Sequence, residues 1–87
     1  MTYSIVAVDI DTRTLGVAVA SGSTYVGSRV PWVEANVGAI ATQGFTNVMY
    51  GKLGLGMLRE GNEPSMVLSR LLMEDKDREY RQVAMID

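Results

Sequence analysis

The sequence predicts an α+β fold, in which an antiparallel β-sheet carries helices on one face and forms half of a four-layer αββα sandwich. Three observations support this prediction. Two helical segments lie between strand-like segments, the strands are apolar on both faces, and 87 residues are enough for one small domain but not for two. Two helices cover only one face of such a sheet, so the other face needs a second sheet or a partner chain.

The first two strands are predicted at residues 3–9 and 15–21, where β-branched and small apolar residues predominate. The polar link between them has hairpin length, so we expect the two strands to be antiparallel neighbours. Both faces of the first strand are largely apolar, one with Tyr3, Ile5 and Ala7 and the other with Ser4, Val6 and Val8. A sheet with one face in water would instead alternate apolar and polar residues.

A third strand and a helix are predicted in the middle of the chain. Glycine and proline interrupt the regular pattern after residue 21, and the next apolar run, at residues 37–43, is the third strand. A helix is predicted over residues 48–59 because Met49, Leu53 and Met57 recur at four-residue spacing.

Glycine residues shape this helix and its end. Gly61 is expected to end it in the left-handed conformation. Gly51, Gly54 and Gly56 lie inside it, and each weakens it by roughly 1 kcal/mol of helix propensity. Their presence is explained if the helix lies very close to a small-residue face of the sheet.

The last third of the chain predicts a second helix and a fourth strand. Pro64 is expected at the first helical position, and the apolar stripe of this helix consists of Val67, Leu68, Leu71 and Leu72. The charged residues 74–79 are expected to form a solvated loop, and residues 81–87 the last strand. Asp87 resembles the first residue of a turn towards another strand. Residues 1–87 are therefore expected to be the amino-terminal part of a single domain whose carboxy-terminal half is absent.

Composition excludes several classes of function. Eight Lys and Arg residues nearly balance ten Asp and Glu residues, so no strong field would attract nucleic acid or an anionic membrane. The sequence has no Cys and no His, which excludes disulfides, thiolate catalysis, imidazole bases and ordinary zinc sites. We expect no metal and no other cofactor. No transmembrane helix or secretory signal is indicated, so a cytoplasmic protein is expected.

The segments YSIVAVD, LGVAVAS, VGSRVPW, VGAIATQG, NVMYGKLGL and REYRQVAMID follow one another with natural spacing. In this order they resemble the amino-terminal half of the family catalogued as domain of unknown function 1028 (DUF1028). Members of that family look like N-terminal-nucleophile (Ntn) hydrolases, with an αββα fold and more than twice this length. The resemblance therefore implies the same architecture that the strands predict.

The resemblance also implies a type of catalysis. An Ntn hydrolase uses a Thr, Ser or Cys at the first position of its mature chain, and the α-amine of that residue, which titrates at about pH 8, is the general base. Thr2 fits this role because removal of Met1 would expose it. Its Oγ would attack an amide carbonyl while backbone N–H groups hold the oxyanion. The alternative is that Thr2 is simply a β-branched residue at the start of a strand.

Two further residues belong to the catalytic hypothesis. Proteasome-type sites place an Asp at the end of the second strand and a Lys further on, whereas this chain has Ser21 at that strand end and no Lys before Lys52. Ser21 is expected either to form a hydrogen bond with the Thr2 amine or to cap the end of the strand. Arg29, the nearest cation, is expected either to bind a carboxylate or phosphate or to be an ordinary surface residue.

Polar residues at the start of the first helix are the candidate substrate-binding residues. Thr42, Gln43 and Asn47 could supply neutral donors and acceptors for an amide substrate, and Gln43 is the strongest candidate. The alternative for Asn47 or Thr46 is that one of them caps the helix. The segment GKLGLG lacks the spacing of a phosphate-binding loop.

Two function classes follow from these residues. In the first, the protein is an Ntn-type amidohydrolase that cleaves a small amide or peptide bond with Thr2 as nucleophile. In the second, it is a non-catalytic αββα module that acts in self-association or partner binding. The apolar sheet face is expected to make the chain form a homo-oligomer or associate with the missing carboxy-terminal half. Neither nucleic acid nor membrane is expected as a partner.

Overall fold

The computed structural model describes residues 1–22, 26–44 and 46–87. In chain order these residues form β1 (Thr2–Asp9), β2 (Thr14–Ser21), β3 (Pro31–Glu34), β4 (Gly38–Gly44), α1 (Val48–Arg59), α2 (Pro64–Met73) and β5 (Arg81–Ile86). Two short 3₁₀ helices, η1 (Val26–Ser28) and η2 (Arg78–Tyr80), precede β3 and β5.

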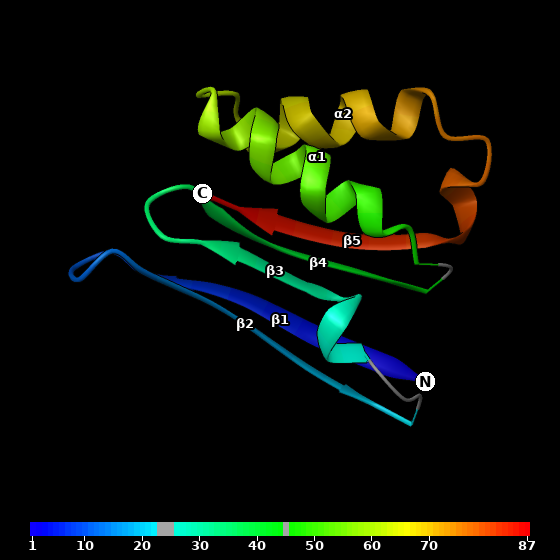
Figure 1. Cartoon of the computed structure of the whole chain (residues 1–87), viewed down its shortest axis with the longest axis horizontal. Coiled ribbons are helices and arrows are strands. Elements are labelled where there is room, and N and C mark those ends of the chain that lie inside the picture. Colours follow the sequence, from blue (N-terminus) through cyan, green and yellow to red (C-terminus); the bar gives the residue numbers. More distant parts are fainter. Residues whose placement is uncertain (23–25, 45) are drawn as a thin grey trace.

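The strands form two antiparallel sheets that lie in separate layers. β1 and β2 pair as a hairpin in which Thr2 is opposite Ser21, and β3, β4 and β5 form a three-stranded sheet with β4 in the centre. Helices α1 and α2 cover one face of the three-stranded sheet, and the hairpin lies against its other face (Figure 1). The α+β class is thus confirmed, with helix, sheet and hairpin layers.

The prediction of a single sheet is wrong, because β1 and β2 form a separate layer. The hairpin covers the sheet face that we expected no residue of this chain to cover. Strand β3, Pro31–Glu34, was also not predicted, because it is only four residues long and begins with a proline. β1, β2, β4 and β5 confirm the predicted strands to within one residue at each end.

Strand β4 is buried along almost its whole length because it is covered on both faces. Ile40 and Thr42 face the helices, whereas Ala39, Ala41 and Gln43 alternate with them and face the hairpin. The small alanine side chains allow the two sheets to approach closely. On the helix side the core includes Ile40, Tyr50, Leu55, Leu58, Val67, Leu71 and Met85.

Helix α1 confirms the predicted bounds and the close approach to the sheet. A Cβ added at Gly54 would lie 2.7 Å from Ile40 Cδ1, and one added at Gly51 would overlap the Trp32 ring, whereas Gly56 faces open space. The residues whose spacing predicted the helix do not form its buried face, because Met49 and Leu53 are exposed. The glycine face packs on the sheet instead.

The helix ends follow the local signals of the sequence. The Asn47 side chain accepts a hydrogen bond from Met49 N at 3.0 Å, which confirms that Asn47 caps α1. Gly61 follows the helix with φ 96°, a left-handed conformation, and Pro64 is the first residue of α2. Val67 and Leu71 of α2 are buried as predicted. No helix in the described part of the chain is long and apolar enough to cross a membrane.

Candidate functional site

A cluster of neutral polar side chains lies where the hairpin meets the three-stranded sheet, at the start of β1. We define the Thr2 cluster as five residues that are connected by hydrogen bonds: Thr2, Ser4, Ser21, Gln43 and Gln82. They come from β1, β2, β4 and β5, so the cluster exists only because the two sheets stack.

Thr2 and Ser21 are brought together by the hairpin register. They are directly opposite each other, and Thr2 Oγ1 lies 2.8 Å from Ser21 Oγ, so one hydroxyl donates a hydrogen bond to the other. Both side chains lie on the hairpin face that is turned towards the three-stranded sheet. The hairpin register thus brings these two candidate residues together through their hydroxyls.

Gln43 connects the two sheets. Its Nε2 donates hydrogen bonds to Thr2 O at 2.7 Å and to Gln82 Oε1 at 3.0 Å, and its Oε1 accepts one from Ser4 Oγ at 2.6 Å. The side chain is only 9% exposed. Ser4 and Gln82 were not among the predicted site residues, because a single Ser or Gln inside a strand gives no signal without the register that brings it to Gln43.

The other predicted site residues lie apart from these contacts. Thr42 is fully buried on the helix side of β4, and its Oγ1 has no hydrogen-bond partner within the parts of the chain that the structure describes. Asn47 caps α1. Arg29 is exposed, and its backbone carbonyl accepts a hydrogen bond from Trp32 Nε1 at 3.1 Å. Of the six predicted residues, Thr2, Ser21 and Gln43 are thus brought together.

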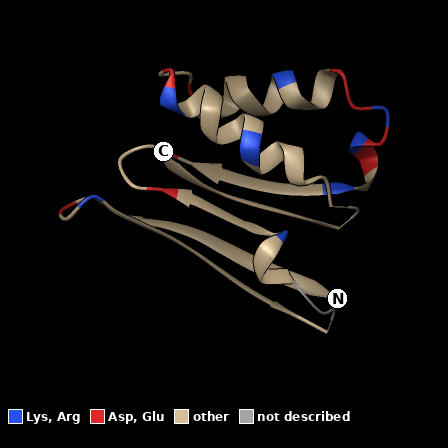
Figure 2. Ribbon diagram, in the orientation of Figure 1, with Lys and Arg blue, Asp and Glu red and all other residues tan. Residues whose placement is uncertain are grey.

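The Thr2 cluster contains no charged side chain. Lys, Arg, Asp and Glu lie mainly in the helices, in η2 and in the loops (Figure 2). In the described ranges, 1–22, 26–44 and 46–87, no three acidic residues gather where a metal ion could bind. The five side chains of the Thr2 cluster therefore offer hydroxyl and amide groups but no carboxylate or amine.

Two concavities flank the hairpin. A crevice of about 460 Å³ lies at the opposite end of β1 from Thr2, and its wall includes Val8, Leu15, Val37 and Leu58 with Arg13 beside them. A shallower groove of about 260 Å³ lies on the outer face of the hairpin and is lined by Tyr3, Ser4, Ile5, Ala18, Val19 and Ala20. The Thr2 and Ser21 side chains point to the opposite face of the hairpin, so this groove does not open onto the Thr2 cluster.

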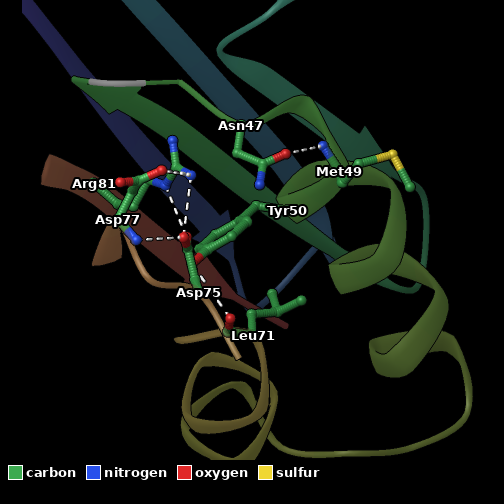
Figure 3. Close-up of polar contacts among 7 residues, drawn as sticks. All are labelled: Asn47, Met49, Tyr50, Leu71, Asp75, Asp77 and Arg81. Atoms are coloured by element: carbon green, nitrogen blue, oxygen red, sulfur yellow. Dashed lines mark hydrogen bonds and ion pairs between the residues drawn. The ribbon is translucent and has the colours of Figure 1, made fainter. Parts of the chain in front are cut away.

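A second polar cluster, on the helix side of the sheet, was not predicted. We call Tyr50, Asp75 and Arg81 the helix-side cluster (Figure 3). Arg81 Nε and Nη2 donate to the two Asp75 carboxylate oxygens at 2.8 and 3.2 Å, and Tyr50 donates its hydroxyl proton to Asp75 as well. The charged side chains of Asp75 and Arg81 are only 9% and 8% exposed.

The contacts of this cluster shift two pKa values in opposite directions. Hydrogen bonds from Arg81 and Tyr50 hold the pKa of Asp75 well below its usual range. Burial and the Asp75 carboxylate raise the pKa of Tyr50 to about 12. At neutral pH the cluster is therefore an ion pair with a protonated tyrosine, which joins the loop after α2 to α1 and β5. Asp75 lies in the segment that was expected to be a solvated loop, and its burial corrects that expectation.

Comparison with known proteins gives a family and a similar solved structure. The family model described as a family of unknown function (DUF1028) matches residues 2–87. The crystal structure of protein SPO2555 from Silicibacter pomeroyi, which is assigned to the same family, is 37% identical in sequence with a TM-score of 0.92. The match covers 99% of this chain but 38% of that protein, so this chain spans well under half of its length. No curated protein matches the chain significantly.

Proposed function

The chain belongs to the DUF1028 family, whose function is unknown, and from this premise we propose that it is an Ntn-type amidohydrolase that cleaves a small amide or peptide bond. The family itself is the one that the sequence motifs predicted. The Ntn-hydrolase-like fold, the activity and the role of Thr2 are parts of the proposal.

One observation carries the proposal: Thr2 is the first residue of β1, and its hydroxyl is hydrogen-bonded inside a cluster that has no other base. After removal of Met1, the Thr2 amine would accept the proton of Thr2 Oγ1 while this oxygen attacks the carbonyl carbon. The C–N bond then breaks, and the leaving amine takes the proton from the Thr2 ammonium. Water, deprotonated by the same amine, hydrolyses the resulting ester.

Ser21 has a defined part in this mechanism. If Thr2 Oγ1 gives its own proton to the amine, the hydrogen bond of 2.8 Å has to be donated by Ser21 Oγ. This donor would stabilise the negative charge that develops on Thr2 Oγ1. The hydroxyl of Ser21 thus replaces the carboxylate that proteasome-type sites have at the equivalent strand end. Arg29 is not needed in any step.

The proposal is tested with mass spectrometry and an electrophile. The mature chain is expected to lack Met1, and a peptide β-lactone is expected to acylate Thr2 Oγ1 through ring opening, so that the mass increases by that of the whole probe. Thr2→Ser should keep the reaction, and Thr2→Ala should abolish it. Retention of Met1, or an equal adduct yield in Thr2→Ala, would refute the proposal.

A second candidate function rests on the outer face of the hairpin, which consists of Tyr3, Ile5, Ala18 and Ala20. Tyr3 and Ile5 are 64% and 63% exposed, and they lie opposite Ala20 and Ala18. Large exposed apolar side chains in one patch are typical of a protein contact surface. On this basis we propose, as the alternative, that the chain is a non-catalytic module that binds another polypeptide through this face. When the chain is alone in solution, a second copy of it is the partner.

A further inference from the structure

We infer that Gln43 is a positioning residue for Thr2, a role that rests on the proposed function and differs from substrate binding. Its side-chain amide holds the backbone carbonyl of Thr2 from the opposite sheet. Gln43 was predicted to bind substrate, but its amide nitrogen contacts Thr2 and Gln82 rather than an open surface.

The chemistry of the contacts fixes the orientation of the Gln43 amide. A backbone carbonyl such as Thr2 O can only accept a hydrogen bond, so the atom 2.7 Å from it must be the Nε2 donor. Gln43 Oε1 then faces the Ser4 hydroxyl, which donates to it at 2.6 Å. The opposite orientation would place two acceptors against each other at Thr2. The assignment therefore follows from hydrogen-bond complementarity.

The donor capacity of Gln43 is fully used. The amide has two N–H groups, and these are engaged by Thr2 O and by Gln82 Oε1 at 3.0 Å. Because Gln43 is also only 9% exposed, a substrate carbonyl could accept a hydrogen bond from its amide only by displacing one of these two bonds. Breaking a buried hydrogen bond leaves a polar group unsatisfied, which is unfavourable by roughly 1–3 kcal/mol.

Thr2 needs such a contact because of its place in the strand. It is the first residue of β1, and β2 is its sole neighbour within the two-stranded hairpin. Strand ends open locally more easily than strand centres. Gln43 attaches Thr2 to β4 and, through Gln82, to β5, so the reactive residue is fixed to both sheets. A displacement of about 1 Å can slow a reaction by roughly 100-fold.

A neutral amide suits this position better than a charged group. An ionised carboxylate at position 43 would place an acceptor against Thr2 O, which can only accept a hydrogen bond. Gln43 supplies directional donors without a charge. This property distinguishes it from an Asp or Glu, which could accept but not donate a hydrogen bond when ionised.

The test compares Gln43→Met, which keeps the side-chain length but removes the three hydrogen bonds, with Tyr50→Phe as the matched control. Tyr50→Phe also removes a buried hydrogen-bonding group, but on the helix side of the sheet. With the β-lactone, Gln43→Met is expected to lower the maximal acylation rate by about 10- to 100-fold and to change the half-saturating lactone concentration by less than about twofold. Tyr50→Phe should leave both values within about twofold.

A second readout does not depend on reactivity. In NMR relaxation of the chain as produced, the Thr2 methyl group should become more mobile in Gln43→Met and stay ordered in Tyr50→Phe. If the wild-type chain forms no adduct, the proposed hydrolase is refuted while this readout still decides the role of Gln43. An unchanged Thr2 methyl group in Gln43→Met, or an equal loss of rate in both variants, would overturn the inference.

Discussion

The close contact between α1 and β3 predicts how two glycine substitutions in α1 change the stability of the chain. Gly51 faces the Trp32 ring, and a methyl group at this position would overlap three of its carbon atoms. Gly56 lies in the same helix and faces open space. Gly51→Ala and Gly56→Ala are therefore a matched pair: they make the same chemical change in the same helix and differ in what the new methyl group meets.

The expected free energies follow from this difference. Each substitution gains about 1 kcal/mol of helix propensity, so Gly56→Ala should stabilise the chain by about that amount. In Gly51→Ala the ring must move, although its Nε1 is held by a hydrogen bond of 3.1 Å to Arg29 O. Overpacking is unfavourable by roughly 1–3 kcal/mol, and the lost hydrogen bond by about 1 kcal/mol. The free energy of unfolding of Gly51→Ala should thus be about 1–3 kcal/mol lower than that of the wild type. It should be roughly 2–4 kcal/mol lower than that of Gly56→Ala.

Urea unfolding measures this difference directly. The chain has one Trp, so its fluorescence reports the contact itself, and far-UV circular dichroism reports the helices independently. The slope of the unfolding free energy with urea should be the same in all three chains, because the buried surface is nearly unchanged. A Gly51→Ala chain that is as stable as the wild type or more stable would show that α1 does not approach β3 so closely.

Two further predictions concern the helix-side cluster and the outer face of the hairpin. Because the pKa of Asp75 is lowered by folding, its stabilising effect is present above about pH 4 and is lost as the pH falls below that value. The free energy of unfolding should therefore fall more steeply from about pH 5 to about pH 3 in the wild type than in Asp75→Asn, and parallel curves would contradict this. In sedimentation at rising concentration the wild-type chain should form dimers and Ile5→Thr should form fewer, because it reduces the exposed apolar surface. A monomeric wild-type chain at high concentration would contradict the second prediction.

Features with a local cause could be predicted from the sequence. The bounds of α1, the left-handed Gly61 and Pro64 at the start of α2 depend on residues only a few positions apart. The register that places Thr2 beside Ser21 is also local, because a short link closes the hairpin. The hairpin alone therefore brings the two hydroxyls of the proposed site together.

Features that depend on the stacking of layers could not be predicted. A strand that is apolar on both faces has the same pattern whether its neighbour is a helix, a sheet or a partner chain, so the sequence did not show that the hairpin forms a separate layer. Gln43 was recognised as a polar residue near a strand end, but only stacking brings it to Thr2. Asp75 belongs to a charged run, and its contact with Tyr50 spans 25 residues.

The register of β4 and β5 explains how the chain keeps charge away from Thr2. Gln82 is opposite Gln43, and Arg81 is opposite Gly44. Because successive side chains in a strand point to opposite faces, Arg81 reaches Asp75 on the helix side and Gln82 reaches Gln43 on the hairpin side. A slip of one residue in β5 would place the guanidinium group beside the Thr2 cluster and leave the Asp75 carboxylate without its ion pair. The ion pair of Asp75 and Arg81, together with the buried Met85, therefore favours the register that keeps the proposed amine base among neutral groups.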